Sequence, residues 1–135
     1  MANALFDKGR EGFLDGSIDW DTNDIRIILV DEGTDNPNVA TDDNLDDITA
    51  GARVAVSNAL DSPTVTSGVA DAADEVLSAV AGATVEDITI YKHTGVESTS
   101  RLIAKIDTAT GLPLTPNGGD VTVAWDNGAN KIFKL

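Results

Sequence analysis

Cysteine is absent from the 135 residues. Disulfide bonds therefore cannot hold the fold, and thiolate catalysis and thiolate metal sites are excluded. This composition fits a protein made in a reducing cytoplasm. Aromatic residues make up only 4% of the chain, so we expect the core to depend on Val, Ile, Leu and Ala. With a single histidine, His93, and no cysteine, the sequence also argues against a zinc or iron site.

Long apolar runs are missing as well. The densest apolar stretch, residues 25–30, includes Arg26 and is far too short to span a bilayer. Residues 1–14 carry two acids and two bases where a signal peptide has an apolar run. We therefore expect neither membrane insertion nor Sec export.

Basic residues are few, 9 against 23 acids, which gives a formal net charge of −14. The charge is uneven, because residues 15–87 carry seventeen acids and two bases. Such a surface repels phosphate backbones and anionic lipid, so the sequence predicts no nucleic-acid partner and no membrane partner. A highly soluble, solvated face is the simpler interpretation of this charge.

Motifs for catalysis are also lacking. The phosphate-binding patterns G-x-x-x-x-G-K-[ST] and G-x-G-x-x-G and the nucleophile pattern G-x-S-x-G do not occur. A Ser-His-Asp set would need His93 with Ser98 or Ser100, and we favour an ordinary histidine at a strand end. A carboxylate pair for glycoside hydrolysis is conceivable among 23 acids, but only six aromatics are available to stack on sugar rings. The sequence predicts no enzyme and no cofactor.

Calcium is the one ion that the sequence brings into consideration. Asp19, Asp21 and Asn23 match the first three side-chain positions of an EF-hand loop, but Asp24 stands where that loop needs Gly and Val30 where it needs Glu. A looser site could use the crowded aspartates Asp42, Asp43, Asp46 and Asp47. We prefer turn capping and solubility as their role, so the sequence predicts no metal site, with these four as weak calcium candidates.

The N-terminal residues predict a short helix. Asn3 can cap it, residues 3–15 form it, and Gly16 can end it. Gly9 and Gly12 weaken it, so it needs packing against its own sheet or against a neighbouring subunit. Its apolar side chains fall on one side and form the predicted assembly interface, Leu5, Phe6, Phe13 and Leu14. We therefore expect residues 1–16 to be a helix and an assembly arm.

Short apolar segments predict seven or eight strands in the remaining chain. Residues 25–31 give the strongest signal and should form a central strand. Residues 32–47 are an acidic loop that we expect to face outward, with one turn at residues 44–48. The other predicted strands are 52–58, 63–67, 75–80, 85–93, 101–107, 121–125 and 131–135.

The connections and faces of these strands complete the fold prediction. Residues 117–119 and 127–128 have the composition of hairpin turns. In the strand 101–107, Leu102 and Ala104 should share the inner face, with Lys105 on the outer face. The fold class is therefore mainly β, an antiparallel β-sandwich or small barrel with a short N-terminal helix, and residues 17–135 form a single β domain.

Both ends of the chain carry distinctive motifs. Residues 2–20 read ANALFDKGREGFLDGSIDW, and residues 91–135 contain T-G-V-E-S-T-S, P-N-G-G-D and W-D-N-G-x-N-K-I-F-K-L. These stretches resemble a family of small proteins encoded among the virion genes of tailed bacteriophages. Members of that family are called capsid decoration (cement) proteins or head- or tail-associated structural proteins.

The resemblance implies a virion structural protein made in the host cytoplasm. The first expectation is a decoration protein that docks on and stabilises the head lattice, with the major capsid protein or other virion proteins as partners and a homo-oligomer, first of all a trimer, as its assembly. The alternatives are a tail, neck or fibre-associated component, and a carbohydrate- or calcium-binding recognition module. The resemblance brings no catalytic motif to this chain.

Overall fold

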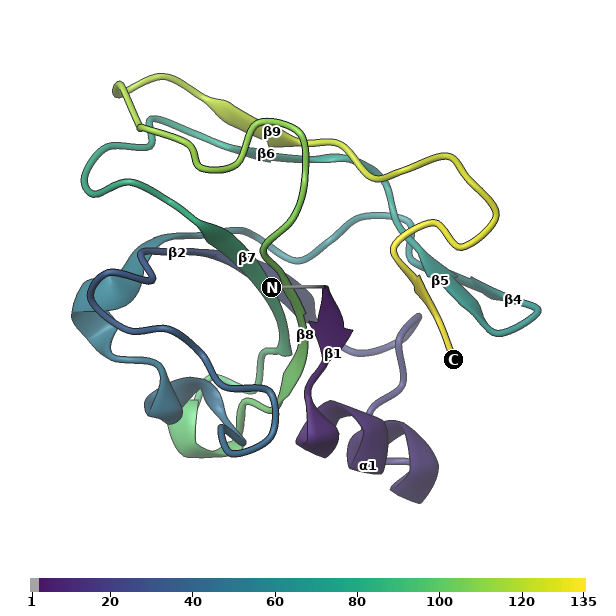
Figure 1. Ribbon diagram of the computed structural model, residues 1–135. Coiled ribbons are helices and arrows are strands. Elements are labelled where there is room, and N and C mark those ends of the chain that lie inside the picture. The colour runs from purple at the N-terminus through teal and green to yellow at the C-terminus, as the bar shows by residue number, and fades with distance from the viewer. Residues whose placement is uncertain (1–2) are drawn as a thin grey trace.

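A five-stranded antiparallel sheet forms the centre of the protein (Figure 1). The structure is a computed structural model that describes residues 3–135. Its strands, in spatial order, are β1 (Ala4–Leu5), β8 (Leu102–Ile106), β7 (Asp87–Lys92), β2 (Ile25–Val30) and β3 (Arg53–Val56). The predicted central strand is confirmed, because β2 lies between β7 and β3 and every residue in it except Arg26 is buried.

Two smaller sheets cover one face of the central sheet. One contains β10 (Phe133–Lys134), β5 (Val69–Asp71) and β4 (Thr64–Thr66), and the other pairs β6 (Glu75–Leu77) with β9 (Val121–Val123). A first core of aliphatic side chains, with Trp20 and Trp125, fills the space between these layers. The mainly β antiparallel fold with one short helix is confirmed, and the sheets lie in layers without closing into a barrel.

The other face of the central sheet is covered by the long connection between β2 and β3. This connection includes the 3-10 helices η1 (Leu45–Asp47) and η2 (Ala50–Ala52), and a third 3-10 helix, η3 (Glu97–Thr99), lies before β8. A second core lies beneath the connection: Phe6, Ile28, Val30, Leu45, Ile48, Ala52, Tyr91 and Leu102. We call this connection, residues 31–52, the lid. It includes the predicted loop 32–47, and it turns its apolar residues inward onto the sheet.

Two predictions about pairing and faces are wrong. The turns at 117–119 and 127–128 do not join paired strands, because β9 pairs with β6 and β10 with β5. Turn composition fixes the local reversal of the chain but not the partner of the next strand. In β8, the register shifts so that Ala104 faces Ile90 and Leu102 faces Tyr91, which leaves Ile103 as an extra residue. This bulge places Leu102 in the second core and Ala104 in the first.

Helix α1 (Asp7–Asp15) is shorter than predicted, because Ala4 and Leu5 form strand β1. Gly16 ends the helix in the left-handed conformation, with φ of 79°, as expected. Gly9 lets the helix lie directly on β8, since a Cβ atom there would be only 2.7 Å from the carbonyl oxygen of Ile103. The glycine that weakens the helix in isolation is thus what allows it to pack.

The four predicted assembly residues occupy very different environments. Phe6 is fully buried in the second core, and Leu5 and Phe13 pack against the first core. Leu14 is 89% exposed. The described part of the segment 1–16 is therefore integrated in the domain, and residues 1 and 2 lie outside the described part. An assembly role for this segment stays a prediction, and among the described apolar residues of the segment Leu14 is the most exposed.

We expect Phe6→Ala to lower the free energy of unfolding by about 3 kcal/mol, because it leaves a cavity in the second core. Leu14→Ala is the matched control from the same segment and should change the free energy by less than about 0.5 kcal/mol. Urea unfolding of the two variants measures both values. Equal midpoints for Phe6→Ala and the wild type would contradict the core position of Phe6.

Candidate functional site

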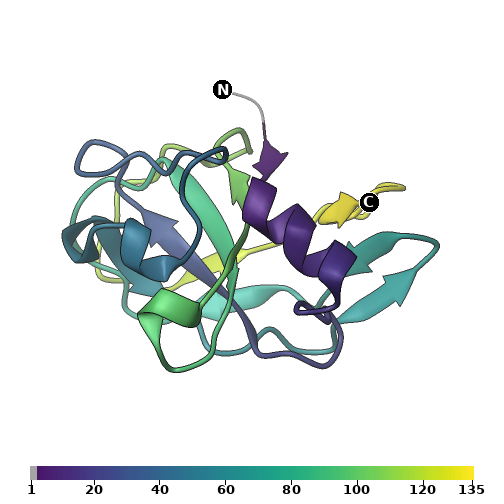
Figure 2. The same cartoon turned by 90° about the horizontal axis from the view of Figure 1, so that it is seen from below.

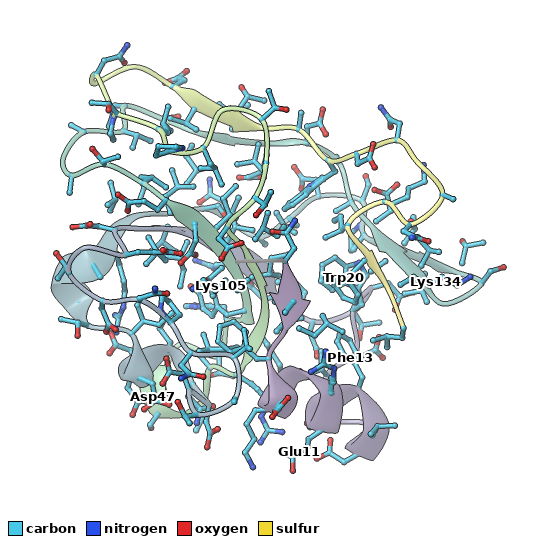
Figure 3. The ribbon with its side chains drawn as sticks, viewed as in Figure 1. Glu11, Phe13, Trp20, Asp47, Lys105 and Lys134 are labelled. Atoms are coloured by element: carbon cyan, nitrogen blue, oxygen red, sulfur yellow. The ribbon has the colours of Figure 1, made fainter. Side chains whose placement is uncertain are left out.

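A cluster of charged side chains is buried where the lid meets the central sheet. Lys105, predicted on an outer strand face, has a side chain that is 1% exposed (Figure 3). Its Nζ lies 3.3 Å from Oε1 of Glu32 and 4.0 Å from Oδ2 of Asp87. It also donates hydrogen bonds to the carbonyl oxygen of Pro37, at 2.9 Å, and to the side-chain oxygen of Asn36. One cation from β8 thus holds three residues of the lid.

The cluster has two carboxyl groups for one ammonium group. Burial raises the pKa of Asp87 to about 7; the hydroxyl of Thr89 and the charge of Lys105 oppose this rise, and Glu32 adds to it. Among residues 3–135, Oε1 of Glu32 and Oδ2 of Asp87 are the buried side-chain atoms without a hydrogen-bond partner. A proton on Asp87 satisfies both oxygens, because a protonated carboxyl group donates to its neighbour.

This cluster is suited to holding the lid rather than to chemistry on a substrate. Asp87 is fully buried and Lys105 nearly so, which leaves a bound molecule no access to either group. Glu32 remains partly exposed, with a side chain that is 21% accessible. Sequence patterns could not indicate this cluster, because Lys105 and Asn36 are 69 positions apart in the chain.

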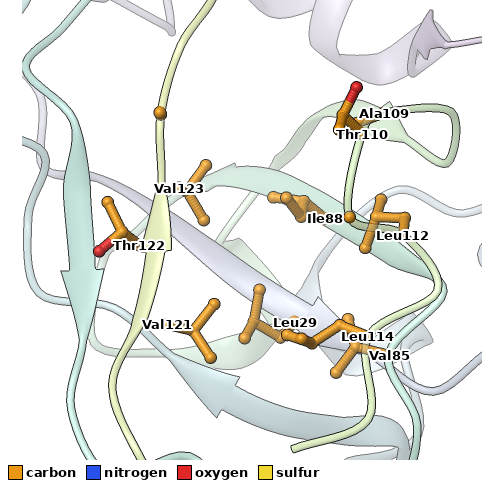
Figure 4. A pocket seen from close by; sticks show the side chains of 12 residues that line it. Leu29, Val85, Ile88, Ala109, Thr110, Leu112, Leu114, Val121, Thr122 and Val123 are labelled. Atoms are coloured by element: carbon orange, nitrogen blue, oxygen red, sulfur yellow. The ribbon is translucent and has the colours of Figure 1, made fainter.

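An apolar cavity of about 190 Å³ lies between the central sheet and strand β9 (Figure 4). Leu29 and Ile88 line it from the sheet, Val121 and Val123 from β9, and Leu112 from the preceding loop. No charged side chain is among its lining residues. The hydroxyl groups of Thr110 and Thr122 also line it. Its volume lies below the range of about 300–1,000 Å³ that is usual for ligand sites, so this cavity has the character of a gap between layers.

A surface groove of about 410 Å³ is the stronger candidate. It lies at the end of the molecule where α1, the β4–β5 hairpin and strand β10 come together (Figure 2). We call it the aromatic groove, and its lining residues are Phe13, Gly16, Ile18, Asp19, Trp20, Asp21, Val65, Gly68, Ala70, Phe133 and Leu135. They come from segments at both ends and in the middle of the chain.

The floor of the aromatic groove is fixed by ring contacts. The ring of Phe133 meets Trp20 edge-on, with centroids 5.2 Å apart, and lies 5.8 Å from the ring of Phe13. The indole Nε1 of Trp20 donates to the carbonyl oxygen of Asp71 at 2.9 Å, which fixes its orientation. On the rim, Val65 is 54% exposed and Leu135 is 61% exposed. The groove thus presents apolar side chains to solvent around a rigid floor.

The rim also carries two carboxylates from the segment that resembles an EF-hand. The Asp19 backbone amide donates to the Asn23 side chain at 2.7 Å, and the Asn23 amide donates to the Asp19 carbonyl oxygen at 2.9 Å. These residues therefore form a tight turn. A hydrogen bond with the Asp19 carboxyl group raises the pKa of Asp21, followed by desolvation and the charge of Asp19. Within residues 3–135, neither carboxylate forms a salt bridge.

Of the four weak calcium candidates in the lid, Asp42 and Asp47 cap turns by accepting hydrogen bonds from backbone amides. The Asp47 carboxylate accepts from the backbone amides of Asp43 and Asn44, and Asp42 accepts from that of Asn38. Asp46 is exposed. Across the described residues, no group of three or more His, Asp or Glu side chains is arranged to hold a metal ion.

His93 and its candidate nucleophiles have separate roles in one turn. The ring Nδ1 of His93 lies 3.5 Å from the Tyr91 hydroxyl, whereas the Ser100 hydroxyl donates to the carbonyl oxygen of Val96 at 2.8 Å. Ser98 is exposed. No hydrogen bond found in residues 3–135 joins His93 to either serine.

Across residues 3–135, no helix is long and apolar enough to cross a membrane.

Comparison with known proteins assigns no family. No protein-family model matches the chain, and no curated protein matches its sequence.

We expect Lys105→Met to lower the free energy of unfolding by about 3 kcal/mol, because it leaves two buried carboxyl groups without their cation. Lys134→Met is the matched control, since Lys134 lies on the exposed side of β10. Urea unfolding should show little change for the control and partial recovery in the double variant Lys105→Met, Asp87→Asn. Equal losses for the two lysine variants would contradict the role of Lys105.

The buried carboxyl group of Asp87 predicts a pH dependence. Its pKa is about 7 in the folded protein against the ordinary 3.8, so the folded state holds the proton more tightly between these values. The contribution of Asp87 to the free energy of unfolding is therefore largest at low pH and declines as pH rises to about 7. Asp87→Asn should lack this decline, so its melting temperature minus that of the wild type should increase between about pH 5 and pH 8. A constant difference would show that Asp87 does not titrate in this range.

Proposed function

We propose that the protein is a structural component of a tailed-phage particle that acts by docking and not by catalysis. Its most direct role is that of a decoration protein on the head lattice, with the major capsid protein as its partner. The resemblance of residues 2–20 and 91–135 to small virion proteins supports the particle as the setting. The aromatic groove supports docking as the mode of action.

The exposed apolar rim of the groove is the observation that carries this proposal. Val65 and Leu135 are more than half exposed next to the packed rings of Phe13, Trp20 and Phe133. Apolar side chains gathered around a preformed groove are typical of a surface that another protein covers. Because the floor is held by ring contacts and by a hydrogen bond, docking needs little ordering of the site, which favours affinity.

The charge of the chain is compatible with such a role. A decoration protein has to stay soluble until it meets the lattice, and a net charge of −14 keeps free copies apart in solution. Apart from Glu32, the lid keeps its acids exposed or half-buried while its apolar residues cover the second core. We include in the proposal that the copies form trimers on the particle, held together by their contacts with the lattice and not by association in solution.

Labelled electron microscopy of intact particles tests the proposal. An antibody raised against the recombinant chain is applied to particles released by the strain that encodes it, and bound label is imaged. We expect many copies over the head. Label confined to one vertex or to the tail would assign the tail, neck or fibre role instead, and absence of the chain from purified particles by mass spectrometry would overturn the proposal.

A further inference from the structure

We infer that the aromatic groove binds an apolar side chain of a partner protein in a segment where lysine or arginine flanks that side chain. The inference rests on the proposed function in one respect, namely that the groove is the docking surface, and it adds the chemistry of the partner. Three observations lead to it: the shape of the groove, the charge of its rim and the ion pairs that most of the chain's own Lys and Arg residues form within the chain.

The shape of the groove selects an apolar group. Its volume of about 410 Å³ lies within the range of about 300–1,000 Å³ that is usual for ligand sites. The floor consists of Phe13, Ile18, Trp20 and Phe133, whose only polar group, the Trp20 indole N–H, is already bonded to a backbone carbonyl. A polar side chain entering here would lose its hydration without gaining a hydrogen bond on the floor, so an apolar side chain is favoured.

The rim of the groove selects a cation beside that apolar side chain. Asp19 and Asp21 line the groove, are exposed and lie close enough for their carboxyl groups to interact. The preceding carboxylate in the chain, Asp15, lies 3.9 Å from Arg101 and so has a cation nearby. The rim pair has none among the described residues, so a lysine or arginine of a partner would relieve the repulsion between two like charges.

The chain's own cations are already in use, which disfavours a second copy as the occupant. Seven of the nine form ion pairs within the chain: Lys8, Arg10, Arg26, Arg53, Arg101, Lys105 and Lys131. Lys92 donates to the carbonyl oxygen of Ser17 at 2.6 Å. Within residues 3–135, Lys134 is the one cation with neither an ion pair nor a hydrogen bond to the backbone. Two copies would also repel each other through their net charge of −14. A different protein with free basic residues fits the groove better.

Short synthetic peptides test this chemistry on the full chain. The probe is the blocked pentapeptide Gly-Lys-Phe-Lys-Gly, and its controls are Gly-Glu-Phe-Glu-Gly and Gly-Lys-Gly-Lys-Gly. Titrations followed by amide and indole NMR shifts should show the probe moving signals of Trp20 and Gly68 and binding at least about tenfold tighter than either control. Equal binding of all three peptides, or no shift with the probe at about 10 mM, would overturn the inference.

Two pairs of variants locate the binding. Asp21→Asn should weaken the probe about threefold, because it removes one rim charge, while the exposed Asp46→Asn leaves binding unchanged. Val65→Thr should weaken it to a similar extent, because it places a hydroxyl on the apolar rim. Val76→Thr is the matched control, since Val76 is also the middle residue of a three-residue strand and is 49% exposed, outside the groove. Equal effects within either pair would place the binding elsewhere.

The outcomes separate this inference from the proposed function. Self-association of the wild type that shifts the groove signals would make a second copy the occupant and overturn the inference. A chain found on particles that does not discriminate among the peptides would overturn only the inference. A chain that discriminates among the peptides but is absent from particles would overturn only the phage role.

Discussion

The buried ammonium group of Lys105 is the interaction on which the architecture depends. It reaches from β8 to Glu32, Asn36 and Pro37 of the lid. The carboxylate of Asp87, on the neighbouring strand β7, lies 4.0 Å from the same ammonium group. Without a covering layer, the second face of the central sheet would leave its apolar side chains in water. The apolar residues Leu45, Ile48 and Ala52 hold the second half of the lid on the sheet, whereas its first half is acidic and polar and is fixed there by this charge-assisted contact. Burial raises the pKa of Asp87 to about 7, which lowers the cost of placing a second carboxyl group in this cluster at and below neutral pH.

The small number of basic residues also determines the charge of the outer surface. A chain with nine basic residues uses one to clamp the lid and most of the others in ion pairs within the chain. The acids left over lie at the surface, where they favour solubility and discourage contact between copies. Asp19 and Asp21 belong to this excess, and they lie at the rim of the aromatic groove. The charge that keeps free copies apart is therefore also the charge that would favour a basic partner at the groove.

Local patterns in the sequence predicted several strands and the end of the helix, whereas long-range contacts determined how the strands pair and which side chains are buried. The apolar run 25–31 predicted β2, and Gly16 predicted the end of α1, because both depend on neighbouring residues only. Strand alternation predicted Lys105 on the face opposite Leu102, but the bulge at Ile103 leaves both residues on the lid side of the sheet. The burial of Lys105 also depends on Asn36, a residue 69 positions earlier. Phe6 was predicted at an assembly surface because it lies on the apolar side of the predicted helix 3–15, yet it fills the second core. The hairpin turns failed for the same reason, since the partner of a strand is chosen by packing across the whole domain.

The aromatic groove could not be predicted for a related reason, and its composition is informative. Phe13, Trp20, Val65 and Phe133 come from four separate segments, so no window of the sequence contains the site. The chain has six aromatic residues, and three of them meet at this one groove while aliphatic side chains fill most of the interior. Trp20 belongs to the first core, and the partly buried rings of Phe13 and Phe133 pack against it, so the core reaches the surface at this groove. Rigid aromatic side chains provide a large contact area at little entropic cost, which is the property that a docking site requires.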